Sequence, residues 1–174
     1  MRHNRISCGI KKRKGQMKNI LLFLVCLIIT YAAAAIGSVA TFASIPNWYA
    51  GLVKPPLNPP NWIFGPVWST LYTLMAIAIF LVVKNGFSTE TVKLAAGFFA
   101  AQLILNTAWS VVFFGMKTTF APIIIIVALW VCIFVCILLF WKISKPASIM
   151  MVPYILWVSF AAYLNIGINI ANRH

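Results

Sequence analysis

Five long apolar segments follow one another along the chain, separated by segments in which polar residues collect. Each segment is close to the roughly 20 residues that an α-helix needs to cross a bilayer. The pattern therefore predicts an all-α membrane protein, a bundle of five transmembrane helices. The predicted spans are residues 20–44, 62–83, 94–114, 122–141 and 149–171.

The connections between these spans predict how the helices are arranged. Those at 84–93, 115–121 and 142–148 are short, so successive helices should be antiparallel neighbours. The first connection, at 45–61, is longer and contains five prolines. No repeat or linker separates a second domain, so residues 19–174 should form one transmembrane domain.

The composition supports a membrane setting. Apolar residues make up 63% of the chain and charged residues only 9%, and the mean hydropathy is +0.96. Soluble domains are about half apolar and about a quarter charged, so this chain has too few polar side chains to cover a surface that faces water. Lipid is therefore the expected solvent for most of it.

The shortage of acidic residues limits the available chemistry. Glu90 is the only acidic residue, which excludes general acid–base catalysis by a pair of carboxylates. The two histidines, His3 and His174, lie at opposite ends of the chain. Cys132 and Cys136 are one helical turn apart, but a metal site needs further ligands at the same depth, so packing is their expected role. We expect no metal site and no cofactor.

The basic residues gather at the N-terminus. Seven of the 14 Lys and Arg residues lie within residues 1–18, and the rest are scattered between the apolar spans. This distribution suits topology signals and anionic lipid headgroups rather than a nucleic-acid groove. We expect residues 1–18 to be a basic tail, either disordered or an upstream extension of a chain that naturally starts at Met17. A cleaved secretory signal ending near Ala34 is the alternative, but the apolar stretch continues to Ile45.

Small residues in the first span favour a close contact between helices. Ala33 and Gly37 are four residues apart, and such pairs let two helix backbones approach each other. Gly97 and Ala101 repeat the spacing in the third span. These pairs fit packing within one chain, and they also fit the contact face of a homodimer.

Amide side chains within the spans should point toward the middle of the bundle, because an amide that faces lipid is unfavourable. Two of them share one face of the third span with Trp109 and Phe113. Such amides serve either to form hydrogen bonds between helices or to bind a ligand. The amides concerned are Gln102, Asn106, Asn165 and Asn169.

Tryptophan is frequent, with seven residues in 174. Trp48, Trp62 and Trp141 lie at the ends of spans, where aromatic residues favour the membrane interface. Four others lie deeper: Trp68, Trp109, Trp130 and Trp157. Indole rings beside a few inward amides suit a flat and mostly apolar ligand, and a packed aromatic core fits the same pattern.

Three stretches of sequence carry a resemblance to a known family. Residues 48–68 read WYAGLVKPPLNPPNWIFGPVW, residues 101–114 read AQLILNTAWSVVFF, and residues 153–165 read PYILWVSFAAYLN. In their order and in their placement on the predicted helices, they resemble the motifs of the tryptophan-rich sensory protein and translocator protein family. The members of this family are also called peripheral-type benzodiazepine receptors. The resemblance covers essentially residues 19–171.

The resemblance implies a bundle that is often dimeric, with a ligand cavity closed by the first connecting loop. It implies that the protein binds porphyrins and other tetrapyrroles, sterols, and benzodiazepine-type or isoquinoline-type ligands, as a sensor or transporter. The residues that match the family's cavity are Tyr49, Phe64, Trp68, Asn106, Trp109, Trp157, Ala161 and Leu164.

The resemblance also implies an alternative, an enzyme that promotes light- and oxygen-dependent breakdown of porphyrin. Porphyrin would then be the substrate, and Trp68 and Trp157 would be the catalytic residues. Indole is a readily oxidised side chain, so this chemistry needs neither acids nor histidine.

The charged residues in the connections predict an orientation in a membrane expected to be the bacterial cell membrane. Eleven basic residues fall on the side of the N-terminus and three on the other side, so the N-terminus should be cytoplasmic. Counted from Met17, the basic residues number five against three. The proline-rich connection would then lie on the outer face.

Cysteine labelling tests this orientation. A cysteine at position 54 should react with an impermeant reagent from outside the cell, and one at position 145 only from the cytoplasm. The reverse pattern of labelling would contradict the charge argument.

Overall fold

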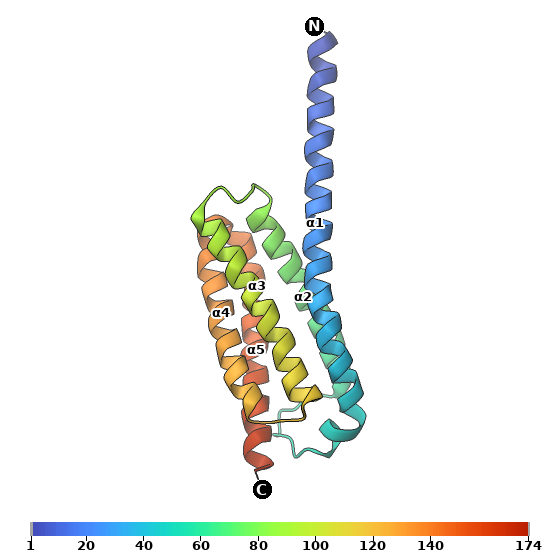
Figure 1. The fold of residues 1–174 in the computed structure, drawn as a ribbon, viewed down its shortest axis with the longest axis vertical. Helices are drawn as coiled ribbons and strands as arrows, with labels where there is room; N and C mark the ends of the chain where they lie inside the picture. The colour runs from blue at the N-terminus through green and yellow to red at the C-terminus, as the bar shows by residue number, and fades with distance from the viewer. Residues whose placement is uncertain (1, 174) are drawn as a thin grey trace.

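The computed structural model describes the backbone of residues 2–173, and the side chains of residue 13 and of residues 15–173. Within this part of the chain there are five long helices and no strand (Figure 1). They are α1 (Arg2–Ser44), α2 (Asn61–Val83), α3 (Glu90–Ser110), α4 (Ala121–Ile143) and α5 (Lys145–Ala171). All five are long and apolar enough to cross a membrane, which confirms the predicted fold class.

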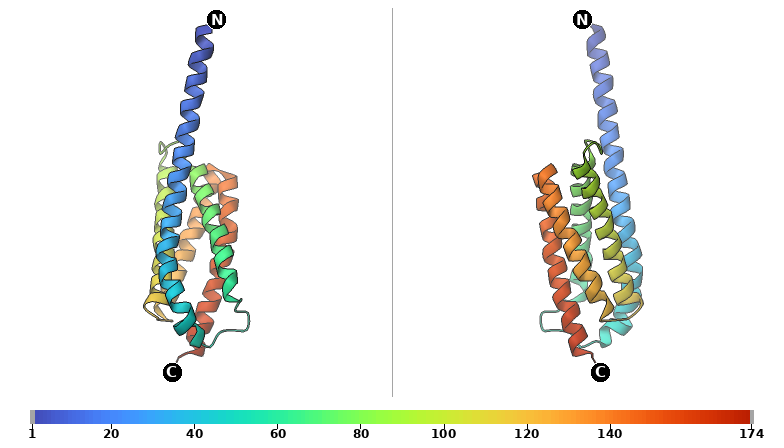
Figure 2. Two further views of the ribbon diagram at one scale, coloured as in Figure 1. Left: turned by 90° about the vertical axis from the view of Figure 1, so that its right-hand side faces the viewer. Right: turned by 60° about the vertical axis from the view of Figure 1, so that its left-hand side comes forward.

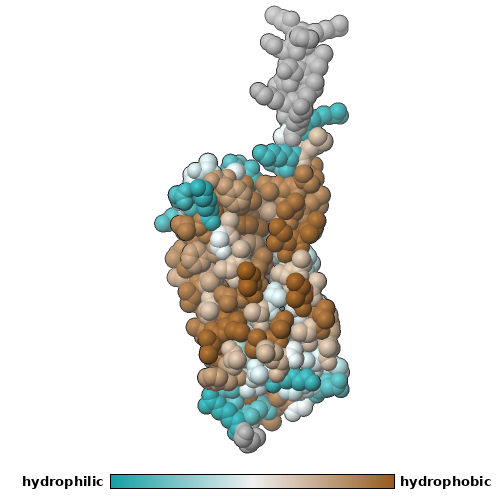
Figure 3. All heavy atoms as spheres, in the orientation of Figure 1, coloured by the Kyte–Doolittle hydropathy of each residue, from teal (hydrophilic) through white to brown (hydrophobic). Residues whose placement is uncertain are grey.

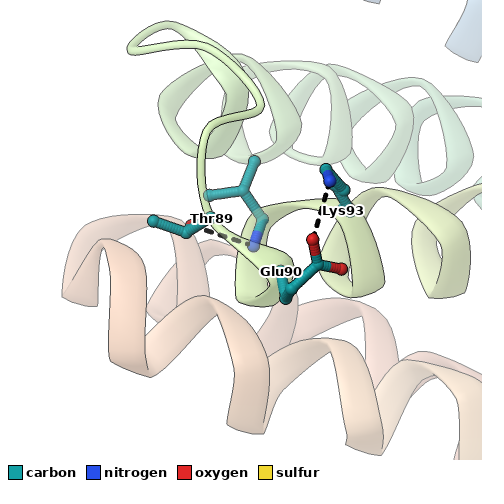
Figure 4. Close-up of polar contacts among 4 residues, drawn as sticks. Thr89, Glu90 and Lys93 are labelled. Atoms are coloured by element: carbon teal, nitrogen blue, oxygen red, sulfur yellow. Dashed lines mark hydrogen bonds and ion pairs between the residues drawn. The ribbon is translucent and has the colours of Figure 1, made fainter.

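The helices extend beyond the predicted spans mainly at their first turns. α3 begins at Glu90, four residues before the apolar segment, because its first turn is polar but capped. The Thr89 side chain accepts a hydrogen bond from the backbone N–H of Val92 at 3.4 Å, and Glu90 pairs with Lys93 at 2.7 Å (Figure 4). A hydropathy pattern alone does not predict such a polar first turn.

α1 is helical from Arg2, over the segment that the sequence analysis expected to be disordered or an upstream extension. No proline interrupts residues 2–44, so the apolar span continues the same helix without a break. That residues 1–16 lie upstream of the natural start stays a prediction.

Successive helices run antiparallel, so each end of the bundle collects its own connections (Figures 1 and 2). The connections that join α2 to α3 and α4 to α5 lie on the N-terminal side. The loop between α1 and α2, the connection between α3 and α4, and the C-terminus lie at the other end. On the face shown in Figure 3, apolar residues form the middle band and hydrophilic residues collect at both ends. The chain is an integral, multi-pass membrane protein.

The buried core lies mainly between α2, α3, α4 and α5. Met75, Ile133, Phe140 and Met151 are fully buried there, one from α2, two from α4 and one from α5, and α3 contributes Phe99. α1 lies along the side of this core, and most of its large apolar side chains face outward. This uneven packing leaves room for a cavity on the side that α1 covers.

α1 approaches α3 through the small residues that the sequence analysis singled out. The hydroxyl of Thr107 donates to the carbonyl oxygen of Ala33 at 3.2 Å. A Cβ atom placed on Gly37 would lie 3.2 Å from the Ser110 side chain, so only glycine allows this approach without a shift. The pair of Ala33 and Gly37 therefore packs within the chain. Gly97, from the second pair, is exposed. The homodimer stays a prediction.

Enlarging Gly37 should loosen α1. Gly37→Leu should destabilise the protein by about 1–3 kcal/mol, the usual effect of overpacking, and should lower the melting temperature in detergent. Gly97→Leu is the matched control, because a Cβ atom there meets nothing within 4 Å. Both changes replace glycine inside a helix by a better helix former, so equal melting temperatures would contradict the proposed close contact.

Candidate ligand-binding site

Two π-helical turns build the end of the bundle at which the loop lies. η1 (Ile45–Tyr49) follows α1, and η2 (Val111–Gly115) follows α3. Such turns occur often at functional sites, because the wider turn redirects the side chains that it carries. The Ser44 hydroxyl donates to the carbonyl oxygen of Phe114, and the rings of Tyr49 and Phe113 meet with their centroids 6.3 Å apart.

A cavity of about 400 Å³ lies beside these turns, between α1, α2, α3 and α5. This volume falls within the range of roughly 300–1,000 Å³ that is typical of small-molecule sites. Seven of the eight residues predicted to bind a ligand line it, from η1, α2, α3 and α5. They are Tyr49, Phe64, Trp68, Trp109, Trp157, Ala161 and Leu164. Their role in binding stays a prediction.

Aromatic rings form much of the wall. Trp68 lies against Tyr72, with centroids 5.5 Å apart and planes tilted by 31°. Trp157, from α5, meets Phe64 edge-on at 6.0 Å. Trp109 stacks on Phe113 at 5.4 Å. Because the two tryptophans Trp68 and Trp157 come from α2 and α5, a flat ligand in the cavity would contact both helices.

Asn106, the eighth predicted residue, does not line the cavity but lies beneath it. It is buried, accepts a hydrogen bond from the Tyr72 hydroxyl at 2.5 Å, and donates to the Tyr154 hydroxyl at 3.1 Å. Tyr154 in turn donates to Gln102 at 2.9 Å. This chain of hydrogen bonds links α2, α3 and α5, and it fixes Tyr72, which does line the cavity.

The other two inward amides fasten the connection between α3 and α4 to α5. Asn165 donates to the carbonyl oxygen of Thr119 at 2.9 Å and accepts from the indole N–H of Trp109 at 3.2 Å. Asn169 pairs with the Thr119 hydroxyl at 3.0 Å. All four amides are buried and bonded between elements, as the sequence analysis expected. Asn165 also faces the cavity, so it belongs to both of the predicted classes.

Several residues of the wall were not predicted. Tyr72 and Phe113 share helix faces with Trp68 and Trp109, so their spacing was a usable signal. The wall that α1 supplies had no such signal, because small residues there suit helix packing equally well. It comprises Tyr31, Ala34, Ala35, Gly37, Ser38, Thr41 and Phe42.

The cavity itself is electrically neutral. Among the described residues that line it, none has a charged side chain. The nearest cation described in contact with a lining residue is Lys54, whose ammonium lies 4.9 Å from the centre of the Tyr49 ring. That ammonium donates to the carbonyl oxygens of Ala50 and Leu52, at 3.2 and 2.9 Å. An ammonium has three protons, so one remains for another acceptor.

The proline-rich loop is fastened across this end of the bundle. The Asn172 side chain pairs with both backbone groups of Val53, at 3.1 and 2.9 Å. Pro55 packs on Gly167 of α5, where a Cβ atom would come within 3.1 Å of the proline ring. The Tyr49 hydroxyl, at the cavity, donates to Asn58 at 2.8 Å. The loop is therefore docked at three points.

These features define a five-helix, multi-pass membrane protein with an aromatic cavity beneath a proline-rich loop. The sequence matches the TspO/MBR family over residues 23–171, and the chain belongs to this family. The resemblance found from the motifs is thereby confirmed.

Individual relatives agree with this assignment. The chain is 42% identical to the tryptophan-rich protein TspO of Chlorobaculum tepidum, over 87% of this chain and 96% of that protein. It is 35% identical to the tryptophan-rich sensory protein of Cereibacter sphaeroides, over 80% of this chain and 87% of that one. It is also 35% identical to the human translocator protein, over 68% and 71% of the two chains.

Replacing Asn106 tests whether it acts through its neighbours. Asn106→Leu keeps the branched shape but leaves the Tyr72 hydroxyl without its partner and removes one of the two partners of the Tyr154 hydroxyl. A buried polar group left unpaired costs about 1–3 kcal/mol. We expect a lower melting temperature in detergent for the variant. The exposed amide substitution Asn61→Leu is the control. An unchanged melting temperature for Asn106→Leu would contradict the structural role.

Proposed function

We propose that this protein binds porphyrins or other tetrapyrroles in the cavity beneath the proline-rich loop, and acts as a membrane sensor or transporter for them. The observation that carries the proposal is the shared wall: Trp68, Trp109 and Trp157, from three helices, line one neutral cavity. Flat conjugated rings bind well against indole, through area and through the geometry of aromatic pairs. The names of two relatives, tryptophan-rich sensory protein and translocator protein, support such a role.

The position of Lys54 supports an orientation for such a ligand. The neutral cavity suits the ring system, whereas carboxylate groups on the ring edge would be poorly solvated inside it. Lys54 lies at the loop end, beside Tyr49, with one ammonium proton to spare. We therefore propose that the carboxylates of the porphyrin point toward the loop, and that the apolar edge of its ring points toward Tyr72.

The second candidate function is enzymatic, and one observation favours it. Trp68 and Trp157 line the same cavity from α2 and α5, so a bound porphyrin would lie beside two oxidisable indoles. In light, bound porphyrin would pass its excitation energy to oxygen, and the activated oxygen would add to the porphyrin ring. The protein would then promote porphyrin degradation, with these two tryptophans taking part.

The remaining partners follow from the same cavity. Sterols and benzodiazepine-type or isoquinoline-type ligands are apolar or weakly polar, so the neutral wall suits them as well. A homodimer, a bacterial cell membrane and a cytoplasmic N-terminus belong to the same proposal. No nucleic-acid partner is included, because the basic residues suit lipid headgroups.

Phenylalanine substitutions separate the two functions. Trp68→Phe and Trp157→Phe each keep a ring in the wall, so porphyrin affinity should fall by less than about tenfold, or 1.4 kcal/mol. If the protein is an enzyme, either change should suppress light-driven porphyrin conversion far more than binding, because phenyl is much harder to oxidise than indole. Absorption titrations in the dark measure binding, and spectra under illumination measure conversion.

Trp130→Phe is the matched control. Trp130 lies on α4 outside the cavity, is 37% exposed, and stacks on Phe134. If this change impaired conversion as strongly as the other two, the site assignment would be wrong. If all three variants converted porphyrin normally, the enzyme function would be wrong and the protein would be a binder alone. An absence of saturable porphyrin binding by the unaltered protein would contradict both proposed functions.

A further inference from the structure

The wall of the cavity is exposed on one side only. The lining residues from α3, η2 and α5 are all buried or half-buried, whereas every exposed one belongs to α1 or α2. The exposed lining residues are Tyr31, Ala35, Phe42, Asn61, Gly65 and Ser69. The cavity therefore opens sideways, through the seam between these two helices, rather than toward the other three.

The loop at the end of the cavity is attached to the C-terminal end of the chain. Asn172 pairs with both backbone groups of Val53, and Pro55 is seated on Gly167. A ligand leaving in that direction would have to break the two hydrogen bonds between Asn172 and Val53 and separate Pro55 from Gly167. The seam between α1 and α2 is held instead by the hydrogen bonds of Tyr31, without a docked loop.

The seam lies between two apolar, membrane-spanning helices. Ala35, Gly65 and Ser69 are all within the spans Gly15–Tyr49 and Asn61–Val83. On α1, the neighbouring Ile36 and Val39 are 60% and 72% exposed, which marks this helix face as a lipid-facing surface.

The serine hydroxyls along the seam are satisfied without water. The Ser69 hydroxyl donates to the carbonyl oxygen of Gly65 at 2.9 Å, and the Ser38 hydroxyl donates to that of Ala35 at the same distance. Hydroxyls bonded to their own helix present little unmet polarity to hydrocarbon. The part of the rim formed by Ala35, Gly65 and Ser69 therefore consists of small residues that are compatible with lipid.

We propose that ligands enter and leave this cavity sideways, directly from the bilayer, through a portal between α1 and α2. This inference rests on the proposed binding function and adds the source of the ligand to it. A site that is filled from hydrocarbon selects compounds that partition into membranes. Such a protein meets its ligand at the concentration in the bilayer, not at the concentration in water.

The Tyr31 side chain connects the two helices at this portal, and we call it the latch. Its hydroxyl lies 3.1 Å from the carbonyl oxygen of Ser69, to which it donates, and 2.8 Å from the Thr73 hydroxyl. Among the residues described, these are the hydrogen bonds that join α1 to α2, and elsewhere the two helices meet through apolar contacts such as that of Phe23 with Phe80. Opening the portal therefore requires the loss of one small polar cluster.

The experiment blocks the portal with a large side chain. Gly65→Phe is suitable because a Cβ atom at Gly65 meets nothing within 4 Å. A neutral porphyrin diester is mixed with protein in lipid nanodiscs, and the quenching of tryptophan fluorescence gives the association and dissociation rate constants. Both should fall by at least about tenfold, which corresponds to a barrier higher by about 1.4 kcal/mol.

Three further proteins complete the experiment. Gly97→Phe makes the same substitution on the exposed face of α3, where a Cβ atom also meets nothing, and should leave both rate constants unchanged. Asn172→Ala releases the loop and should leave them unchanged as well. Tyr31→Phe removes the latch and should raise both of them, which tests the portal even if Gly65→Phe fails to fold.

The outcomes are distinguishable. Faster exchange in Asn172→Ala, with unchanged exchange in Gly65→Phe and Tyr31→Phe, would overturn the portal and make the loop the route. Faster dissociation in Gly65→Phe would show loss of affinity rather than a blocked passage, and would also overturn it. In either case saturable binding to the unaltered protein would leave the proposed function standing. An absence of saturable binding would remove the proposed function and the portal together.

Discussion

Amide and phenol side chains buried between these helices need partners within the bundle, because the surrounding hydrocarbon offers none. The chain from Tyr72 through Asn106 and Tyr154 to Gln102 meets this requirement with one acceptor for each donor. It joins three helices at one depth and fixes how each is rotated about its axis. The orientation of Trp68, which rests against Tyr72 and Tyr154, depends on this arrangement.

The cavity lies where the tight packing of the buried core ends. α2 to α5 share the buried core, while α1 is held to α3 by a close contact at Gly37 and to α2 by the latch at Tyr31. Residues of α1 from Tyr31 to Phe42 line the cavity beside the aromatic wall, and most of them are small. The π turns at Ile45–Tyr49 and Val111–Gly115 then close one end with aromatic rings. The small residues of α1 thus leave room for a ligand, and the proposed portal lies along the same helix.

Much of the fold could be predicted from hydropathy, because length and apolar content suffice to identify a helix that spans a bilayer. Seven residues of the cavity wall could be predicted only through resemblance to a family. Their spacing along the helices did not distinguish a ligand cavity from a packed aromatic core. Asn106 shows the limit most clearly: its inward direction was predictable, but its partners were not. Which tyrosine meets which amide depends on how neighbouring helices are rotated and staggered, and a periodic pattern on one helix does not contain that information. The wall supplied by α1 was missed for the same reason.

The central claim is that the neutral cavity is a specific site for a flat apolar ligand. An equilibrium titration of the unaltered protein in lipid nanodiscs with a neutral porphyrin diester tests this most directly, with tryptophan fluorescence as the signal. The account predicts quenching that saturates at one ligand per chain, and that an isoquinoline-type ligand reverses by competition. Quenching that rises in proportion to the porphyrin dissolved in the lipid, without saturation or competition, would contradict it.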